Sequence, residues 1–373
     1  MYFTNDSMLP ENQQPLIITV APFGPQWLPG DFPEDIPVTW EEQTQKAVDC
    51  YNAGAAVLHL HVRDPKTGHG SKDFKQFNEQ IARLRKAVPK MVIQVGGSIS
   101  FAPPKGEGEA KWLGYDTRHM LTELNPKPDQ ITIVVGTVLM NILALTTPDD
   151  VQGTALANPA MQAAYQNMVA DATPEFYIEH LKRLRKNKIQ PMFAMAHIHT
   201  LEAIEHLIRT GVYMGPLNHT MTAIGGAGGC GRNPFDFMEW VRRSPQGSVA
   251  TYESLWRTVP PYAAMAIALG IHMRVGIEDN MWRRKGERMT SVQQVEQVVR
   301  LAKELNRKVA TAEEARQILK IGTWYDSPEE TLANLGLPPN RKGGQLGFIV
   351  KETDGKLRPP VQASDGHAIA GHV

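Results

Sequence analysis

The chain has 373 residues, 39 basic and 39 acidic residues and two cysteines. This length is enough to bury a large core, and the zero formal charge argues against nucleic acid or a membrane surface as the main partner. Cys50 and Cys230 form no CxxC motif, the N-terminus lacks the regions of a signal peptide and no apolar run could span a bilayer, so a cytoplasmic protein is expected.

Short apolar runs alternate with helical patterns along the chain. The expected strands cover residues 16–21, 56–62, 91–95, 130–135, 191–196, 216–221, 248–251 and 271–277. The expected helices cover residues 39–53, 73–87, 174–186, 201–210, 234–242, 260–269 and 291–305, and four of them begin with the N-cap candidates Thr39, Asp73, Thr173 and Ser291. Eight strand–helix units predict a (β/α)8 TIM barrel over residues 1–320. An open doubly wound sheet is the alternative, but it would carry fewer strands, and no GxGxxG motif follows the first strand.

Three segments lie outside the repeating units. Residues 100–108 and 146–173 lengthen the connections after the third and fourth strands, on the side where barrel enzymes carry their chemistry. Residues 321–373 are rich in proline, glycine and charge, and we expect this C-terminal extension to pack on the barrel or on a neighbouring subunit. Disorder is the alternative for this extension.

The most informative motif is VLHLHVRD, at residues 57–64, which ends the second expected strand. Side chains alternate faces along a strand, so His59 and His61 point in the same direction. Neutral imidazole is the commonest nitrogen ligand of Zn²⁺ in proteins, and the pair therefore indicates a metal site. A pair of hydrogen-bonded histidines at a polar strand end is the alternative.

The eighth expected strand ends in the sequence Glu278-Asp279-Asn280. In a closed barrel the eighth strand lies beside the first, and the first lies beside the second. The carboxyl ends of the eighth and second strands are therefore separated by two strand spacings, roughly 10 Å. Glu278 can then meet His59 and His61 above the first strand. Three protein ligands with one open position are typical of catalytic zinc sites. Considered alone, the Glu-Asp-Asn sequence could instead cap a helix.

Four segments together resemble one known family. HLHVRD at residues 59–64, NAGAAV at 52–57, PVTWEE at 37–42 and MRVGIEDN at 273–280 resemble the β-keto acid cleavage enzymes, typified by 3-keto-5-aminohexanoate cleavage enzyme. The similarity extends from about residue 15 to residue 320. The resemblance implies a Zn²⁺-dependent TIM barrel, usually a homotetramer. It also implies a reaction that condenses a β-keto acid with acetyl-CoA and cleaves the adduct to acetoacetate and a new CoA thioester.

The resemblance also implies roles for individual residues. Those that match the family's metal ligands are His59, His61 and Glu278. Arg274 and Asp279 match its arginine and aspartate beside the metal, and Thr132 matches its substrate-contacting threonine on the fourth strand. Deprotonating the carbon between two carbonyls needs a base beside the metal, and Asp279 paired with Arg274 is the candidate. An ion pair that only orients the loop is the alternative.

Two positions depart from the family pattern. Gln26 stands where a family glutamate holds the substrate's amine, and an amide cannot neutralise a buried ammonium, so we expect a substrate without an amine. Gly96 stands where a family serine binds the substrate carboxylate. Ser98, or the backbone amides of Gly96 and Gly97, could bind this carboxylate instead, because consecutive glycine amides can cradle an anion.

Two further motifs carry weaker predictions. His197 and His199 form a second HxH pair, expected to be hydrogen-bonded pocket histidines, with a second metal site as the alternative. The glycine-rich sequence GGAGGCGR at residues 225–232 precedes an expected helix and could present Gly228, Gly229 and Arg232 to a CoA phosphate. A flexible loop at the barrel mouth is the alternative.

The sequence therefore predicts a zinc-dependent β-keto acid cleavage enzyme that uses acetyl-CoA, forms a homo-oligomer and binds neither nucleic acid nor membrane. A metal-dependent aldolase or hydrolase that uses the same barrel without CoA is the alternative. A binding protein without activity is disfavoured, because the metal ligands and the Arg274–Asp279 pair are retained together.

Overall fold

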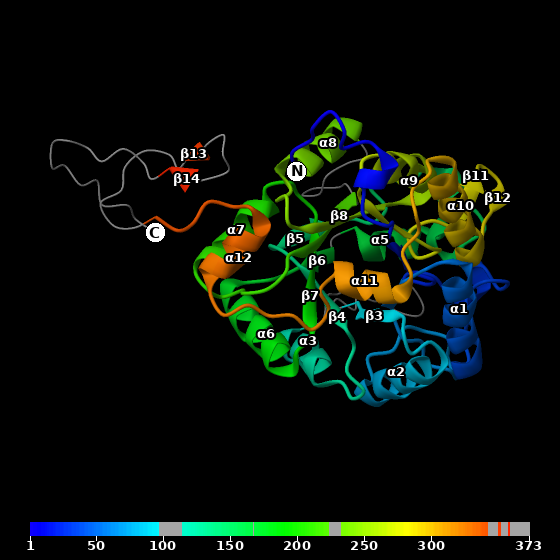
Figure 1. Cartoon of the computed structure of the whole chain (residues 1–373). Helices are drawn as coiled ribbons and strands as arrows, with labels where there is room; N and C mark the ends of the chain where they lie inside the picture. The colour runs from blue at the N-terminus through cyan, green and yellow to red at the C-terminus, as the bar shows by residue number, and fades with distance from the viewer. Residues whose placement is uncertain (97–113, 167, 224–232, 342–349, 352–356, 359–373) are drawn as a thin grey trace.

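The computed structural model describes residues 1–96, 114–166, 168–223, 233–341, 350–351 and 357–358. Eight parallel strands close into a barrel with the order β1-β10-β9-β8-β7-β4-β3-β2, and helices surround it (Figure 1). The barrel strands are β1 (Ile18–Val20), β2 (Val57–Leu60), β3 (Val92–Val95), β4 (Gln130–Val134), β7 (Gln190–Met195), β8 (Asn218–Ala223), β9 (Val249–Ser254) and β10 (His272–Val275). The prediction of a TIM barrel is confirmed.

Seven of the helices around the barrel correspond to predicted helices, and α3 (Tyr115–Met120) has no predicted counterpart. The seven are α1 (Trp40–Ala53), α2 (Phe74–Ala87), α6 (Pro174–Asn187), α7 (Thr200–Arg209), α8 (Pro234–Arg243), α9 (Val259–Ala268) and α10 (Ser291–Glu304). The side chains of Thr39, Asp73 and Thr173 cap α1, α2 and α6 as predicted. The cap of α10 is Thr290 rather than the predicted Ser291, because a capping box pairs Thr290 with Gln293.

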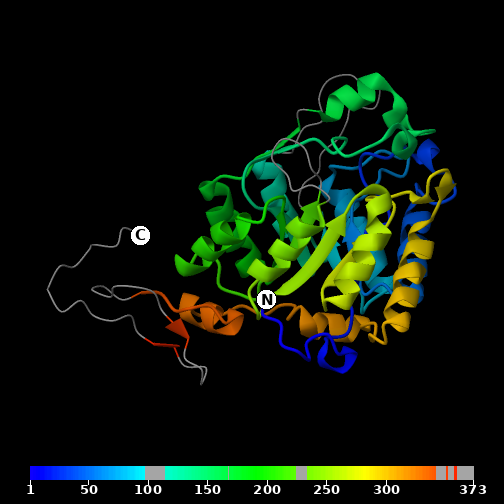
Figure 2. The same ribbon diagram turned by 90° about the horizontal axis from the view of Figure 1, so that it is seen from above.

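An insertion follows β4 at the carboxyl end of the barrel. It comprises β5 (Val138–Met140), α4 (Pro148–Val151), α5 (Pro159–Tyr165) and β6 (Met168–Ala170), and β5 pairs with β6 antiparallel. Figure 2 shows it at the top, at the end of the barrel opposite the N-terminus. The insertion packs in a separate hydrophobic cluster with Trp27, Trp256 and Trp282. It therefore covers the strand ends that carry the chemistry of barrel enzymes.

The chain after α10 forms two more helices, α11 (Ala312–Ile318) and α12 (Pro328–Leu335). Helix α12 lies beside α7 (Figure 1), and Arg209 Nη1 donates hydrogen bonds to the carbonyl oxygen of Pro338 and to Asn340 Oδ1. Two small antiparallel strand pairs complete the elements of the described residues, β11 (Trp282–Arg284) with β12 (Glu287–Arg288), and β13 (Val350–Lys351) with β14 (Leu357–Arg358). Within the described residues, no helix combines the length and the apolar character needed to cross a membrane.

The strand alternation decides which side chains reach the inside of the barrel. Leu58, Leu60 and Val62 are buried in the main hydrophobic core together with residues of the surrounding helices. His59 points the other way and pairs in register with Gln94 of β3, where it makes a side-chain hydrogen bond. His59 therefore lies on the strand face opposite Leu58, Leu60 and Val62, as the alternation predicts.

Candidate metal centre and active site

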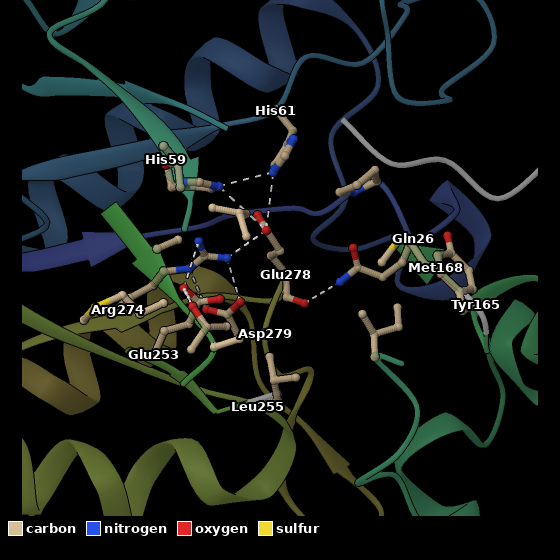
Figure 3. Close-up of a pocket in the computed structure, with 18 of the residues that line it drawn as sticks. Gln26, His59, His61, Tyr165, Met168, Glu253, Leu255, Arg274, Glu278 and Asp279 are labelled. Atoms are coloured by element: carbon tan, nitrogen blue, oxygen red, sulfur yellow. Dashed lines mark hydrogen bonds and ion pairs between the residues drawn. The ribbon is translucent and has the colours of Figure 1, made fainter. Parts of the chain in front are cut away.

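Three predicted metal ligands meet at the carboxyl end of the barrel (Figure 3). His59 Nε2 lies 3.2 Å from His61 Nε2. Glu278 Oε1 lies 3.4 Å from His61 Nε2 and 3.8 Å from His59 Nε2. β1 pairs with β10 on one side and with β2 on the other, so the predicted path across the first strand is the observed one. Among the described residues these three form the one group of histidine, cysteine or carboxylate side chains close enough to share a metal ion.

A glycine gives the loop after β10 the shape that places Glu278. Gly276 has φ +135°, and a Cβ there would lie 2.1 Å from the carbonyl oxygen of Ala21 at the end of β1. The same carbonyl oxygen accepts a hydrogen bond from the Glu278 amide at 3.2 Å. The chain therefore crosses β1 in close contact, which turns Glu278 toward the two histidines.

Gln94 fixes the tautomer of His59. Its amide nitrogen Nε2 donates to Gln130 Oε1 at 3.0 Å, so its oxygen Oε1 is the atom that faces His59 Nδ1 at 2.8 Å. His59 Nδ1 must therefore carry the proton, which leaves the lone pair of Nε2 facing His61 and Glu278. Burial lowers the pKa of His59 to about 3, with Arg274 adding to the shift, so this imidazole is neutral near pH 7. A neutral histidine with a free Nε2 is the form that binds a metal ion.

Arg274 is surrounded by three carboxylates. Its guanidinium donates to both oxygens of Asp279 at 2.7 and 2.9 Å, and Nη2 lies 2.7 Å from Glu278 Oε1. Nη1 lies 3.4 Å from Glu253 Oε2. Burial raises the pKa of Asp279 against the attraction of Arg274, and the carboxylates of Glu253 and Glu278 raise it further. A buried carboxyl with a raised pKa is a stronger base than one in water.

The charges around Arg274 favour a divalent cation. When ionised, Glu253, Glu278 and Asp279 carry three negative charges against one guanidinium, which leaves two in excess. Within the described part of the chain, Glu278 Oε2 and His61 Nδ1 are buried without a hydrogen-bond partner. Two neutral imidazole nitrogens and one carboxylate form the donor set of catalytic zinc sites. The residues present therefore fit a Zn²⁺ ion, which would also balance the excess charge.

Gln26 holds the loop that carries Glu278. Its Nε2 donates to the backbone carbonyl oxygen of Glu278 at 2.6 Å, and Trp27 Nε1 donates to the same oxygen at 3.3 Å. Figure 3 shows this contact between Gln26 and the backbone of Glu278. Gln26 lines the cavity, where the sequence predicted a substrate contact, and one of its two amide N–H groups is used by the chain itself.

The structure gives Gly96 a steric role beside His61. A Cβ at this position would lie 2.5 Å from His61 Cε1. The Gly96 amide donates to the carbonyl oxygen of Leu60 at 3.0 Å, so it is not free to hold a substrate carboxylate as the sequence suggested. The other candidates for that role, Gly97 and Ser98, lie outside the described residues.

The remaining candidates are placed as follows. Thr132 lines the cavity, and its hydroxyl donates to Gln94 Oε1 at 3.4 Å. The rings of His197 and His199 stack with centroids 4.9 Å apart, and no third ligand accompanies them among the described residues. Gly228, Gly229 and Arg232, predicted to contact CoA, lie in residues 224–232, outside the described part.

Arg63 of the histidine motif has a structural role. Its side chain is buried and donates to the carbonyl oxygens of Gly68 at 2.6 Å and of Gly24 and Trp27 at 2.8 Å. It therefore joins the loops after β1 and β2, which carry Gln26 and His61.

We expect Arg63→Ala to lower the free energy of unfolding by about 3 kcal/mol or more, because three buried carbonyl groups lose a charged donor. Urea unfolding followed by circular dichroism measures the change. The matched control is Lys66→Ala, at an exposed position in the same loop, with an expected change below about 0.5 kcal/mol. Equal stability of Arg63→Ala and the unmutated protein would contradict this role.

A cavity of about 150 Å³ opens from the candidate metal centre. Its inner end carries the charged residues and Thr222, whose hydroxyl donates to Glu253 Oε2 at 3.2 Å. Mainly apolar side chains form its other wall: Pro25, Val134, Ile142, Tyr165, Met168, Leu255 and Trp256. Of these, Ile142, Tyr165 and Met168 belong to the insertion between β4 and α6.

Two residues of the site, Gln94 and Glu253, belong to none of the motifs that the sequence shows. Gln94 stands directly opposite His59 in the register of β2 and β3. Pairing of these two strands in the sequence could therefore have identified Gln94 as a neighbour of His59. Glu253 lies near the end of β9, a strand that was predicted to stop at residue 251. Because side chains alternate along a strand, extending the predicted strand by two residues would have placed Glu253 at the carboxyl end of the barrel.

Comparison with known proteins identifies relatives along most of the chain. The family model described as beta-keto acid cleavage enzyme matches residues 15–321. The 3-keto-5-aminohexanoate cleavage enzyme of Acetoanaerobium sticklandii is 30% identical over 309 residues, which cover 82% of this chain and 98% of the relative. The 3-oxoadipate:acetyl-CoA acetyltransferase of Cupriavidus necator is 25% identical and covers 82% of this chain and 95% of its own length.

Solved structures show the same fold. The apo structure of ObcA superposes with a TM-score of 0.57 at 14% sequence identity, covering 77% of this chain and 66% of ObcA. Identity at this level supports the barrel architecture and leaves the chemistry to the site itself.

Proposed function

The chain belongs to the beta-keto acid cleavage enzyme family, and from this premise we propose that it transfers the acyl group of a β-keto acid to CoA with acetyl-CoA as co-substrate. Relatives named as acetyl-CoA-dependent transferases support this reaction type. We further propose that the metal ion is Zn²⁺, held by His59, His61 and Glu278. The observation that carries the proposal is the meeting of these three ligands with the Arg274–Asp279 pair in one buried cavity.

The proposed reaction conserves atoms and needs no oxidant or reductant. Removal of a proton from C2 of the β-keto acid gives an enolate, whose C2 forms a bond to the acetyl carbon of acetyl-CoA while the C–S bond breaks. The released CoA thiolate then attacks the original keto carbon. Cleavage of the bond between that carbon and C2 gives a new acyl-CoA and acetoacetate, and the proton returns to C2.

Individual residues of this chain have separate roles in the proposed reaction. A bound Zn²⁺ supplies Lewis acidity that stabilises negative charge on the keto oxygen. Asp279 takes the proton from C2 and later returns it, which suits its raised pKa. Arg274 holds Asp279 in place through two hydrogen bonds and offers positive charge to the substrate carboxylate.

The test is incubation of the zinc-loaded protein with 3-oxo acids and acetyl-CoA, with mass spectrometry of the products. We expect a new acyl-CoA and acetoacetate in equal amounts, and no consumption of the 3-oxo acid when acetyl-CoA is omitted. Cleavage without acetyl-CoA would instead identify an aldolase or hydrolase on the same barrel.

Gln94→Leu is expected to weaken zinc binding by about 10- to 100-fold, because the leucine keeps the side-chain volume but cannot accept the proton on His59 Nδ1. Competition with a chromogenic zinc chelator measures the affinity. Gln80→Leu is the matched control, since Gln80 is equally buried but lies on α2, away from the site. Equal zinc affinity of the Gln94 variant and the unmutated protein would contradict the assignment of His59 as a ligand.

A further inference from the structure

We propose that the substrate carries an uncharged, apolar tail at the keto carbon, and that the insertion between β4 and α6 selects it. This inference rests on the proposed function, because it assumes that a β-keto acid occupies the cavity. Beyond that function, the proposal specifies the class of acid and the segment of the chain that contacts its tail.

The cavity is divided into a charged end and an apolar wall. The titratable side chains that line it among the described residues gather around the candidate metal centre; they are His59, His61, Glu253, Arg274, Glu278 and Asp279. Figure 3 shows Tyr165 and Met168 across the cavity from His59 and Arg274, with Leu255 completing the wall. The carboxylate and the keto oxygen, which every β-keto acid carries, match the charged end. The tail must then point toward the apolar wall.

The insertion supplies the part of the wall that is farthest from the barrel strands. Met168 is the first residue of β6, Tyr165 is the last residue of α5, and Ile142 follows β5. Met168 and Tyr165 are 3% and 2% exposed, so a tail that reaches them leaves water. They pack in one cluster with Trp27 and Trp256, which holds the wall in place. The position of these side chains is therefore set by the fold.

A charged tail would meet no counter-charge on this wall. Among the described lining residues no lysine or second arginine faces the insertion, and the carboxylates already contact Arg274. Gln26, which also lines the cavity, is uncharged and uses one of its two amide N–H groups on the Glu278 backbone. An ammonium or carboxylate brought here loses its hydration without a counter-charge, so acids with charged tails are disfavoured.

Three acids with six carbons test the proposal because they differ mainly in the tail. They are 3-oxohexanoate with an apolar tail, 3-keto-5-aminohexanoate with an ammonium and 3-oxoadipate with a carboxylate. We expect kcat/KM with acetyl-CoA to be at least about 100-fold higher for 3-oxohexanoate than for either charged acid. Isothermal titration of the zinc-loaded protein with each acid, without acetyl-CoA, should give the same order of affinity.

The two measurements separate this inference from the proposed function. Turnover with a preference for a charged acid would overturn the apolar tail and leave the reaction in place. Binding in the expected order without acyl-CoA formation would overturn the proposed reaction and support the apolar pocket. Equal affinity for all three acids would overturn the inference in either case.

A charge placed on the wall tests the role of the insertion. Ile142→Lys is expected to shift the ratio of kcat/KM toward 3-oxoadipate by about 10-fold or more, since the half-buried position lets the ammonium reach both cavity and water. Val169→Lys is the matched control, because Val169 neighbours Met168 on β6 but is 46% exposed and does not line the cavity. An equal shift in both variants, or none in Ile142→Lys, would remove the insertion from the proposal.

Discussion

Replacing His61 with alanine should remove the bound metal and lower kcat by about a thousandfold or more, because stabilisation of charge by a metal ion contributes several kcal/mol. His61 Nε2 lies within 3.4 Å of both other ligand atoms, so its loss leaves only two ligands. Plasma emission spectrometry on dialysed protein gives the metal content, and the acyl-CoA assay gives kcat.

The control for this substitution is His199→Ala, which alters the other HxH motif. His199 is exposed and stacks on His197, so the metal content should stay at that of the unmutated protein. Glu278→Gln provides a second test with little change of volume, and it too should lose metal. Full metal occupancy in His61→Ala, or loss of metal in His199→Ala, would place the ion elsewhere.

Asp279→Asn should lower kcat by about a hundredfold or more while the metal content stays unchanged, as expected when a general base is removed. The amide can still accept a hydrogen bond from Arg274, but it cannot take the proton from C2. This substitution is more informative than Arg274→Ala, which would leave three buried carboxylates facing one another and destabilise the fold.

Exchange of the C2 proton in D₂O shows whether Asp279 acts as the general base or only supports the structure of the site. Without acetyl-CoA, the unmutated enzyme should exchange this proton faster than buffer does, and Asp279→Asn should reduce the rate to that of buffer. Glu253→Gln is the comparison, because Glu253 reaches Arg274 through one 3.4 Å contact and is expected to retain enzymatic exchange. Enzymatic exchange in Asp279→Asn would assign the proton transfer to another group.

The barrel and the meeting of His59, His61 and Glu278 could be predicted because both depend on local patterns and on closure. Alternating apolar residues located the strands, and closure alone brings β10 beside β1 and β1 beside β2. The contact between Glu278 and the histidines then follows from strand order. No knowledge of side-chain conformation was needed to predict it.

The parts that escaped prediction depend on packing between segments far apart in the chain. The strands β5 and β6 have three residues each, too few to show a period, and they pair across the helices between them. The hydrogen bond from Gln26 to the Glu278 backbone depends on how two loops meet, which no spacing in the sequence encodes. Family resemblance suggested a substrate contact for Gln26, and the fold adds a contact within the protein.

Strands β1 and β10 form the seam at which the first and last parts of the barrel meet. The histidines are translated early, on β2, and Glu278 is translated only after β10. During synthesis on the ribosome the nascent chain therefore cannot complete the ligand set until nearly the whole barrel has emerged. With the proposed ligand set, zinc capture requires a closed barrel, and a truncated chain that lacks β10 offers two of the three proposed ligands at most. Metal loading would then select for correctly closed molecules.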